Sequence, residues 1–561
     1  MAIPALERGD ARASGRWGSR ALVAATAALA HASALGGGWI WLDHAHIGER
    51  YAIAEPTGWL GLFTRGFAGT GYYRPLMALA LSIDALVGRA WFYHAVNVAW
   101  HAVASVLVAA VAEGLVKSAH ARRAAWLGGS LFAVHPLASL VASGIAFRSE
   151  AMMAVALLGL CLAHREGKAV LAGGLLFAGA LIKETALVLG PLYVLAFELT
   201  APRRGARGES AARRRLLAWE AGALACAVGL RLAYAPPWRA LHAEMPLGAA
   251  LGTRFGLVGK SVLALVFPLN RSICDAFPVL SLSSARSLAG VVLVAGIGVL
   301  AFYRRGPALL FALSLLPSLN LAPLSRWWSP HYLYLPLAFA AMLAAEGVFR
   351  VWPRATARSL AAVAPTGTVA VVACLGLLTA RDDRRFASDE TLWSREVAAC
   401  DACLEGHFYL GEVRRAAGRW EQAAKHYEAA LRPRPGWLAY VDRGAALQNL
   451  GTVRLELGHL DASAAAFREA LTEARDERTQ RTLRHDLATV AMRSGDAAEA
   501  VRLLEPELAR ADAFPESVFL CAKALHTLGR DDASRVLLAR LRNVARADAP
   551  TNTTQATVPT D

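Results

Sequence analysis

Side chains that exchange protons and bind anions stand at the ends of long apolar stretches in this chain. Asp43 follows directly after the apolar stretch Ala21–Leu42, with His44 and His46 close behind it, and Arg74 precedes another apolar segment. A charge at the edge of a hydrocarbon layer is costly unless it is paired or hydrated, so such groups indicate a functional cavity by default. A lone acid there could be a simple helix-terminus residue. The long loop over residues 43–90 favours the functional interpretation, because loops of that length need their own structure.

More ionisable groups have the same placement. Arg148 and Glu150 flank a turn between apolar stretches, and Lys183 and Glu184 lie between two others. Arg148 and Glu150 are two apart and would not share a helix face. Lys183 with Glu184 could be no more than an interfacial cap. A later loop adds Arg326 and His331 on either side of Trp327-Trp328.

The elements that must position these groups are membrane spans. Hydrophobic residues make up 55% of the chain, and many stretches are about long enough to cross a hydrocarbon core of roughly 30 Å. This composition excludes an ordinary soluble enzyme. We expect an all-α, multispanning membrane domain over residues 1–380. Its expected crossings, about eleven, are 21–42, 91–114, 124–144, 150–164, 169–182, 185–200, 216–234, 287–303, 307–324, 332–349 and 359–380.

The charge distribution predicts the orientation. Residues 1–380 hold 33 Lys+Arg against 16 Asp+Glu, and residues 381–561 hold 26 against 28, so the net +15 belongs to the membrane part. Basic loops on one side of a membrane explain this excess better than nucleic-acid binding does. The expected cytoplasmic segments are the N-terminus with Arg8, Arg12, Arg16 and Arg20, and residues 117–123, 165–168, 203–215, 304–305 and 350–358.

An odd number of crossings places the C-terminal domain outside. Phe255–Pro268 is taken as an interfacial or re-entrant helix; if it spans, both the count and that side change. The first apolar stretch could also be a signal peptide. It is long and ends in Trp-Ile-Trp-Leu rather than in small residues, so we interpret it as an uncleaved span.

The C-terminal part contains a tetratricopeptide (TPR) repeat pattern. Weaker copies follow the first unit, and together they predict about four helical hairpins over residues 404–546. Small residues let two helices approach closely, and the aromatic residue fills the gap between successive hairpins. A generic amphipathic helical bundle is the alternative. Residues 381–403 are expected as a connector and 547–561 as a disordered tail. The first unit carries Gly411, Gly418, Ala423, Tyr427, Ala430 and Pro435.

The seven cysteines indicate little. Cys400 and Cys403 form a Cys-x-x-Cys pair without a second pair or a histidine cluster, which disfavours zinc. A local disulfide and two free thiols both stay open.

The order of short motifs resembles the transmembrane and tetratricopeptide-repeat (TMTC) O-mannosyltransferases, which are membrane glycosyltransferases of the GT-C class. The resemblance covers nearly the whole chain. It implies a polyprenyl-phosphate-linked sugar donor, possibly carrying mannose, a protein hydroxyl as acceptor, and inverting transfer on the non-cytoplasmic side. The motifs are the Asp after the first span, Tyr-Tyr-Arg-Pro-Leu at residues 72–76, Phe-Tyr-His at 92–94, His135-Pro136, Phe-Arg-Ser-Glu at 147–150, Ile-Lys-Glu-Thr-Ala at 182–186, Leu-Pro-Ser-Leu-Asn at 316–320 and His-Tyr-Leu-Tyr-Leu-Pro at 331–336.

Roles follow from this resemblance. Asp43 is the expected base for the acceptor hydroxyl, with Glu49 and Glu55 next in line, and Arg74, Lys183 and Arg148 are the expected partners of the donor phosphate. The family typically has adjacent acids where this chain has Asp43-His44, so a metal site would need His44 or His46 as its second ligand. Most GT-C enzymes of this type need no metal, and the resemblance therefore implies no metal or other cofactor. The TPR groove would recruit the protein acceptor. The other expected site-lining residues are His44, His46, Tyr73, His135, Glu150, Glu184, Arg326 and His331.

Two other functions fit the same organisation. A polymerase or ligase of the O-antigen type is also multispanning, but it would have one large exterior loop late among the spans. A non-enzymatic, membrane-anchored TPR scaffold would tolerate replacement of Asp43, Arg74 and Lys183. The alanine- and arginine-rich composition favours a bacterial inner membrane with periplasmic repeats, and the topology would also suit an endoplasmic reticulum.

Overall fold

The structure is a computed structural model that describes residues 5–47, 58–67, 71–116, 121–200, 207–235, 245–269, 272–321, 326–351 and 358–547. It is almost entirely helical, which confirms the all-α prediction. The chain forms two compact units. The first contains residues 1–402 with 434–440, and the second contains residues 403–433 with 441–561.

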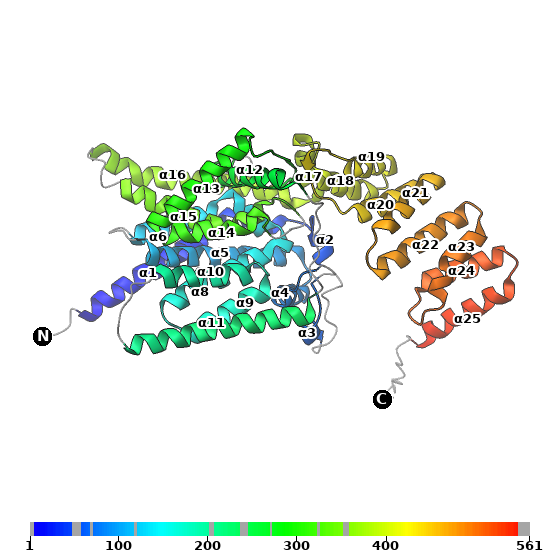
Figure 1. The fold of residues 1–561 in the computed structure, drawn as a ribbon, viewed down its shortest axis with the longest axis horizontal. Coiled ribbons are helices and arrows are strands. Elements are labelled where there is room, and N and C mark those ends of the chain that lie inside the picture. Colours follow the sequence, from blue (N-terminus) through cyan, green and yellow to red (C-terminus); the bar gives the residue numbers. More distant parts are fainter. Residues whose placement is uncertain are drawn as a thin grey trace, which may run out of the picture. The chain divides into compact units, whose positions relative to one another are not determined.

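The first unit is a bundle of apolar helices (Figure 1). Residues 381–402, expected as a connector, belong to this unit. The helices are α1 (Ala5–Ala30), α2 (Asp43–His46), α3 (Gly58–Gly61), α4 (Pro75–Ala85), α5 (Ala90–Leu115), α6 (Ala121–Val134), α7 (Ser139–Ser143), α8 (Arg148–Arg165), α9 (Ala169–Ile182), α10 (Ala186–Thr200), α11 (Arg207–Tyr234), α12 (Leu247–Val266), α13 (Ala285–Arg304), α14 (Pro307–Ser314), α15 (Tyr334–Val351), α16 (Arg358–Asp383) and α17 (Asp389–Ala399). Short 3-10 turns at Ala32–Gly36 (η1), Pro136–Ala138 (η3), Ile145–Phe147 (η4), Leu316–Leu319 (η5), Pro330–Leu333 (η6) and Arg384–Ala387 (η8) join them.

Several of these helices have the length and composition of membrane spans. Six pass by length and hydropathy within the described residues, or seven if the bent pair Ala121–Val134 and Pro136–Ser143 is one span. Shorter apolar helices include Gly18–Ala30, Ala169–Ile182 and Ala186–Thr200. The expected count of eleven crossings stays a prediction.

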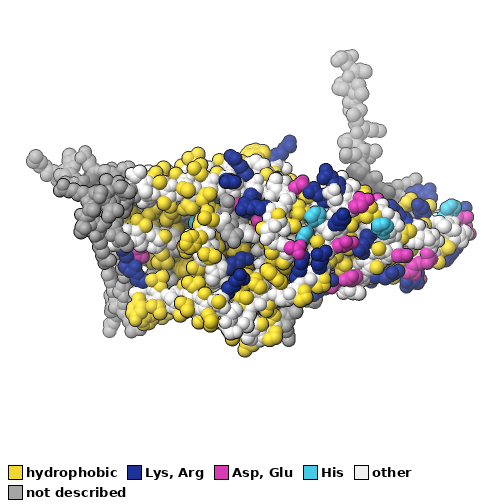
Figure 2. Space-filling view, turned by 90° about the horizontal axis from the view of Figure 1, so that it is seen from above, with side chains coloured by type: hydrophobic (Ala, Val, Ile, Leu, Met, Phe, Trp, Pro, Cys, Tyr) yellow, Lys and Arg dark blue, Asp and Glu magenta, His cyan; other side chains and the backbone are white. Residues whose placement is uncertain are grey.

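Apolar side chains cover the outer surface of the bundle. Val292 and Phe302 of α13 are 70% and 68% exposed, which would be unfavourable in water and suits contact with lipid. Figure 2 shows a mostly hydrophobic surface on this unit, whereas basic and acidic side chains alternate over the repeats. The chain is therefore a multi-pass membrane protein.

One end of the bundle gathers most of the buried polar side chains; we call it the site end. There α6 and α9 finish and α5, α8 and α15 begin. The Asn97 amide of α5 donates to the Val141 and Gly144 carbonyls at 3.2 and 3.1 Å, and His101 lies 2.7 Å from the Tyr334 hydroxyl of α15. These bonds hold the ends of distant helices together.

Helix α12 passes the length test for a span, although the sequence favours an interfacial helix for residues 255–268. Near its start, the Ser287 hydroxyl from the first turn of α13 donates to the Gly252 carbonyl at 2.9 Å. Near its end, the ring Nε2 of His135 lies 3.2 Å from the Leu265 carbonyl oxygen. Because α13 begins and α6 ends at the same side in the eleven-span arrangement, α12 would lie along the site end.

The second unit contains four helical hairpins, in the region where the sequence predicts TPR repeats. Two glycines, of which Gly411 belongs to the predicted repeat unit, lie where the two helices of a hairpin are in close contact. A Cβ on Gly411 would come within 2.6 Å of the Tyr427 ring, and one on Gly451 within 2.7 Å of the Phe467 ring. Tyr427 also packs against α20 of the following hairpin, so the aromatic residue fills gaps both within and between hairpins. The hairpins are α18 (Leu404–Ala416) with α19 (Trp420–Leu431), α20 (Arg443–Glu456) with α21 (Leu460–Glu473), α22 (Glu477–Arg493) with α23 (Ala497–Leu508), and α24 (Pro515–Thr527) with α25 (Asp531–Ala547).

The segment from Arg434 to Tyr440 belongs to the first unit although it lies between α19 and α20 in the chain. It forms strand β2 (Trp437–Leu438), which pairs antiparallel with β1 (Phe277–Pro278). The Tyr440 amide also donates to the Asp275 carboxylate at 2.8 Å.

Candidate functional site

The segment over residues 145–150 is the centre of the candidate site. Helix α7 ends just before it, with Gly144 as its C-cap residue. The segment forms the 3-10 turn η4 and then starts α8 at Arg148. Its Phe147 ring lies 4.9 Å from the Trp41 ring and 4.7 Å from the His331 ring, centroid to centroid. This segment therefore connects the chain before Asp43 with the later loop that carries His331.

Asp43 is buried at the start of α2, with 1% of its surface exposed. Its Oδ1 accepts the Ala146 amide at 2.7 Å, and its Oδ2 accepts the Ile40 amide at 3.3 Å. Burial raises the pKa of Asp43 to about 7, although the amide donors and the charge of His44 partly lower it. A carboxylate with a pKa near neutral pH is well suited to general base catalysis.

Asp389, at the first turn of α17, holds the chain just before Asp43. Its Oδ1 accepts the Trp41 amide at 2.8 Å, and its Oδ2 lies 2.6 Å from Nε2 of His44. Trp41 has a left-handed backbone with φ of 51°, and its ring meets the Trp393 ring edge-on at 5.1 Å. A tryptophan in that conformation costs about 1–3 kcal/mol and persists only where surrounding contacts impose it.

Asp389 was not predicted as a site residue, since nothing in the local sequence signals its partners. It lies beyond the last expected span, and a Ser-Asp-Glu run is an ordinary helix start. Ser388 indeed forms a capping box with Thr391.

Arg74 and Glu184 form a bidentate ion pair across two expected exterior loops. Nε of Arg74 donates to Oε2 at 2.9 Å, and the second guanidinium nitrogen contacts Oε1. The guanidinium also lies over the Tyr72 ring, 4.2 Å from its centroid. Burial alone would raise the pKa of Glu184, but Arg74 and Lys183 outweigh it and lower that pKa to about 2. The pair is therefore ionised at neutral pH.

Lys183 and its neighbour Glu184 pair with different residues. The Lys183 ammonium pairs with Glu150 in α8, and both side chains are buried. The same Glu150 oxygen lies 3.8 Å from Nε2 of His331, whose Nδ1 is 2.6 Å from the Ser329 hydroxyl. Lys183 and Glu184 thus each pair with a residue distant in the sequence, Glu150 of α8 and Arg74 before α4.

Arg148, predicted as a phosphate partner, faces away from this cluster. It is fully buried and pairs with Asp84 of α4, and its other nitrogens donate to the Asn97 side chain and the Tyr93 carbonyl. The geometry confirms that Arg148 and Glu150 use different helix faces. Arg148 as placed positions the start of α8 rather than offering a surface to an anion.

Arg326 bridges the two parts of the site. Its guanidinium lies over the Trp41 ring at 5.3 Å and over the Tyr440 ring at 4.7 Å. Trp41 is two residues before the buried carboxylate, so this cation stands beside the Asp43 segment. The Tyr440 contact comes from the segment after the first repeat hairpin, a neighbour that the sequence gives no reason to expect.

The other predicted residues have more structural surroundings. His46 packs its ring edge-on against Phe67 at 5.2 Å, and the Tyr73 hydroxyl donates to the Phe63 carbonyl at 2.9 Å. His135 lies against Leu265 of α12 and accepts the Leu137 amide at 3.2 Å. These residues shape the first loop and the α12 contact. The alternative bases Glu49 and Glu55 lie outside the described residues.

Within the described ranges, no three His, Cys, Asp or Glu side chains are grouped so that they could hold a metal ion. The expectation of a metal-independent reaction stays a prediction.

An apolar groove of about 1000 Å³ runs along the outside of the bundle between α9 and α11. Val170, Gly174 and Phe177 line it from α9, and Trp219 and Cys226 line it from α11. Helix α9 ends at Ile182, directly before Lys183. The groove helix therefore leads to the cationic cluster.

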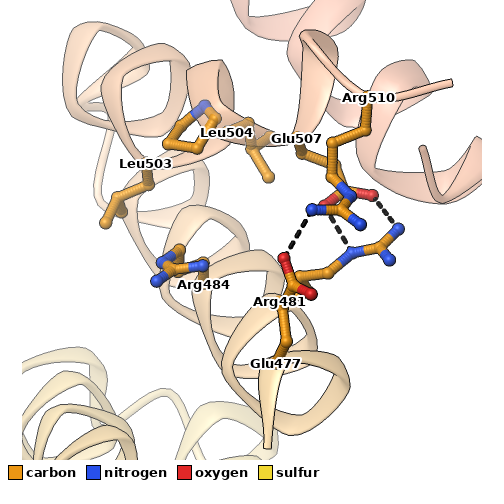
Figure 3. A pocket seen from close by; sticks show the side chains of 8 residues that line it. Glu477, Arg481, Arg484, Leu503, Leu504, Glu507 and Arg510 are labelled. Carbon is orange, nitrogen blue, oxygen red and sulfur yellow. Dashed lines mark hydrogen bonds and ion pairs between the residues drawn. The ribbon is translucent and has the colours of Figure 1, made fainter. Parts of the chain in front are cut away.

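A smaller hollow of about 340 Å³ lies in the repeat unit between α22 and α23 (Figure 3). Its charged lining is mostly engaged internally. Arg481 holds both Glu507 oxygens, at 2.8 and 2.6 Å, and Arg510 pairs with Glu477. These contacts stabilise the hairpin, and we assign no chemistry to the hollow.

Comparison with known proteins gives two related similarities. Protein O-mannosyl-transferase Tmtc2 of Drosophila melanogaster is 32% identical over 227 residues, which cover 36% of this chain and 24% of Tmtc2. Protein O-mannosyl-transferase Tmtc1 of the same organism is 35% identical over 126 residues, 21% of this chain and 14% of Tmtc1. The matched region therefore spans about a quarter of the length of Tmtc2 and a smaller share of the length of Tmtc1. A search of protein-family models gave no match. The predicted resemblance to TMTC proteins is confirmed over these parts of the chain, and its extent over nearly the whole chain stays a prediction.

Proposed function

We propose that this protein is a membrane glycosyltransferase that moves a sugar, with mannose the first candidate, from a polyprenyl-phosphate donor to a hydroxyl of a protein. The observation that carries the proposal is a buried carboxylate of raised pKa beside a cluster of cations at one end of a membrane bundle. The similarity to O-mannosyl-transferases supports the same assignment.

Asp43 is the proposed base. Each of its oxygens accepts one backbone amide, and a carboxylate oxygen can accept more than one hydrogen bond. The acceptor hydroxyl would donate its proton to a remaining lone pair while its oxygen attacks the anomeric carbon. Attack from the face opposite the phosphate inverts that carbon. Asp389 would fix Asp43 by holding Trp41 in its strained conformation.

Arg74, Lys183 and Arg326 are the proposed partners of the donor phosphate. Arg74 pairs with Glu184 and Lys183 pairs with Glu150, and the Arg326 guanidinium lies over the Trp41 and Tyr440 rings. The donor phosphate would contact these cations. Its negative charge increases as its bond to the sugar breaks, and the cations would stabilise that charge. Stabilisation of developing charge by fixed donors is commonly the largest single contribution to catalysis.

The groove between α9 and α11 is proposed to hold the apolar tail of the donor. Its lining is almost wholly apolar, and the helix that forms one wall ends at Lys183. A polyprenyl chain in the groove would place its phosphate at the membrane edge. We further propose that the site end lies outside the cytoplasm and that the repeats present an extended protein segment, since solenoids bind along a concave face.

The test is incubation of the purified full-length protein with a panel of polyprenyl-phosphate sugars and a hydroxyl-bearing peptide, followed by mass spectrometry. One donor should yield glycosylated peptide and free polyprenyl phosphate in equal amounts. Joining of glycan units without peptide product would favour an O-antigen-type polymerase. Absence of turnover with every donor would favour a scaffold.

Reporter fusions test the proposed orientation in the membrane. Alkaline phosphatase fused after Ala380 should be active, and the same reporter within residues 203–215 should be silent.

A further inference from the structure

We propose that Cys274 and Cys400 form a disulfide that ties the segment before β1 to the end of α17. All seven cysteines are free thiols in the structure. The sequence leaves a Cys400–Cys403 disulfide and two free thiols open, and in the structure Cys400 shares a hydrogen bond with the Cys274 thiol. The proposal rests on the side assigned to the site end above, because disulfides persist in oxidising compartments.

Glu396 independently places the two cysteines together. The backbone amides of Ile273 and Cys274 donate to Oε2 of Glu396 at 3.2 and 3.3 Å, and the Ser272 hydroxyl contacts the same oxygen. Cys400 caps α17 four residues after Glu396, and its amide donates to the Glu396 carbonyl at 2.9 Å. Glu396 lies in the last turn of α17, so it holds Cys274 at the end of the helix that leads into Cys400.

Exposure favours Cys400 as the thiol at which exchange begins. Cys400 is half-buried, whereas Cys274 is 4% exposed. The thiol hydrogen bond and burial raise the pKa of Cys400, and the nearby charge of Lys260 lowers it in part. Lys260 lies over the Trp328 ring, 3.8 Å from its centroid.

The oxidant is the disulfide of an exchange partner of the thiol–disulfide class. The Cys400 thiolate attacks one partner sulfur, the partner S–S bond breaks, and its other sulfur leaves as a thiolate. The Cys274 thiolate then attacks Sγ of Cys400, which forms the Cys274–Cys400 bond and releases the second partner sulfur. The two protons from the protein thiols pass to the two partner thiolates. The partner disulfide gains two electrons, and the protein loses two.

The bond would join two elements that border the site. Helix α17 carries Asp389 and Trp393, which hold Trp41. The segment after Cys274 carries Asp275, which holds the Tyr440 amide, and the Tyr440 ring lies over Arg326. Oxidation would therefore fix the walls on both sides of Arg326 without altering a residue of the proposed transfer site.

The test traps thiols by alkylation in intact cells, before the full-length protein is purified, digested without reductant and analysed by mass spectrometry. We expect a linked peptide pair containing Cys274 and Cys400 in the wild type and in the control C403S, and none in C274S or C400S. Dithiothreitol should lower the thermal midpoint of the wild type and C403S but not of C274S or C400S.

Alkylation of both Cys274 and Cys400 in cells, or a Cys400–Cys403 link, would overturn the proposal. The assay does not depend on transfer. Linked peptides in a protein that transfers no sugar would support the disulfide and overturn only the proposed function. Sugar transfer by a protein in which both thiols are alkylated would support the proposed function and overturn only the disulfide.

Discussion

Ion pairs at the site end of the bundle and on the exposed surface of the repeats have opposite character. At the site end, Arg74–Glu184 and Lys183–Glu150 are buried and join residues far apart in the chain. In the repeats, Arg502–Glu499 lies on a single helix, and the Arg502 side chain is 69% exposed. Burying two charges costs several kcal/mol of desolvation, whereas exposed pairs contribute about 0–1 kcal/mol. Charges kept in an apolar bundle at that cost indicate function, and exposed pairs indicate a solvated surface.

The largest effect is expected at Asp43. Asp43→Asn keeps the shape of the side chain but removes the basic oxygen, so transfer should fall by roughly 10²–10⁴-fold. Donor binding should change little, because Asp43 faces the acceptor in the proposed reaction. Turnover and donor affinity measured on the same preparation separate the two effects, and a parallel loss of donor affinity would contradict the assignment.

The buried cations come next. Arg74→Ala and Lys183→Ala each remove a charge facing the donor phosphate, and each should weaken donor binding on the order of 10–100-fold, as for other charged hydrogen bonds. Arg148→Ala serves as the control for the same structural loss, because it likewise leaves a buried acid, Asp84, without its partner. That variant should lose about 3–5 kcal/mol of stability. If it shifted donor affinity as Lys183→Ala does at equal folded fraction, the separation of Arg148 from the phosphate site would fail.

Variants of Asp389 test whether this residue contributes to turnover only by positioning Trp41 and Asp43. Asp389→Ala removes the acceptor that holds Trp41, so Asp43 should shift and turnover should fall roughly 10–100-fold with little change in donor KM. Asp389→Asn keeps an acceptor oxygen for the Trp41 amide and should recover most of the rate. Equal loss in both variants would mean that the negative charge of Asp389, and not the hold on Trp41, is what matters.

Part of this comparison could be predicted from the sequence and part could not. Apolar stretches predict the helices, and the spacing of Gly411 and Tyr427 predicts the repeat hairpins, because both signals are local. The ionisable residues at the site end could also be picked out singly. Their pairing could not be predicted, since the neighbours Lys183 and Glu184 pair with residues from different parts of the chain. Asp389 and Cys274 were missed because their partners lie far away in the chain.

The apolar groove should give a smaller effect. A Cβ at Gly174 meets no atom within 4 Å, so Gly174→Phe can fill the groove without disturbing α11. Donor KM should rise several-fold, since about 25 cal/mol is lost for each Å² of apolar contact that the tail gives up. Gly296 of α13 also faces open space, and Gly296→Phe should leave donor KM unchanged. A matching rise in both variants would exclude the groove as the tail site.

The smallest effect is expected for the exposed pair in the repeats. Arg502→Ala should change the free energy of unfolding by about 0–0.5 kcal/mol, because water screens the pair. Denaturant titration of this variant beside Arg148→Ala measures the contrast between the two regions. Similar losses in both would remove the distinction between buried and exposed charges.

The most direct test of Asp43 as the base is the pH dependence of kcat/KM for the acceptor. Asp43 acts when ionised, and its pKa in the free protein is about 7. The wild-type value should fall about tenfold for each pH unit below 7 and become level above it. Asp43→Asn should be slow at every pH and show no break near 7. A variant that keeps near-normal turnover, or that keeps the same break, would contradict the account, because another group would then take the proton.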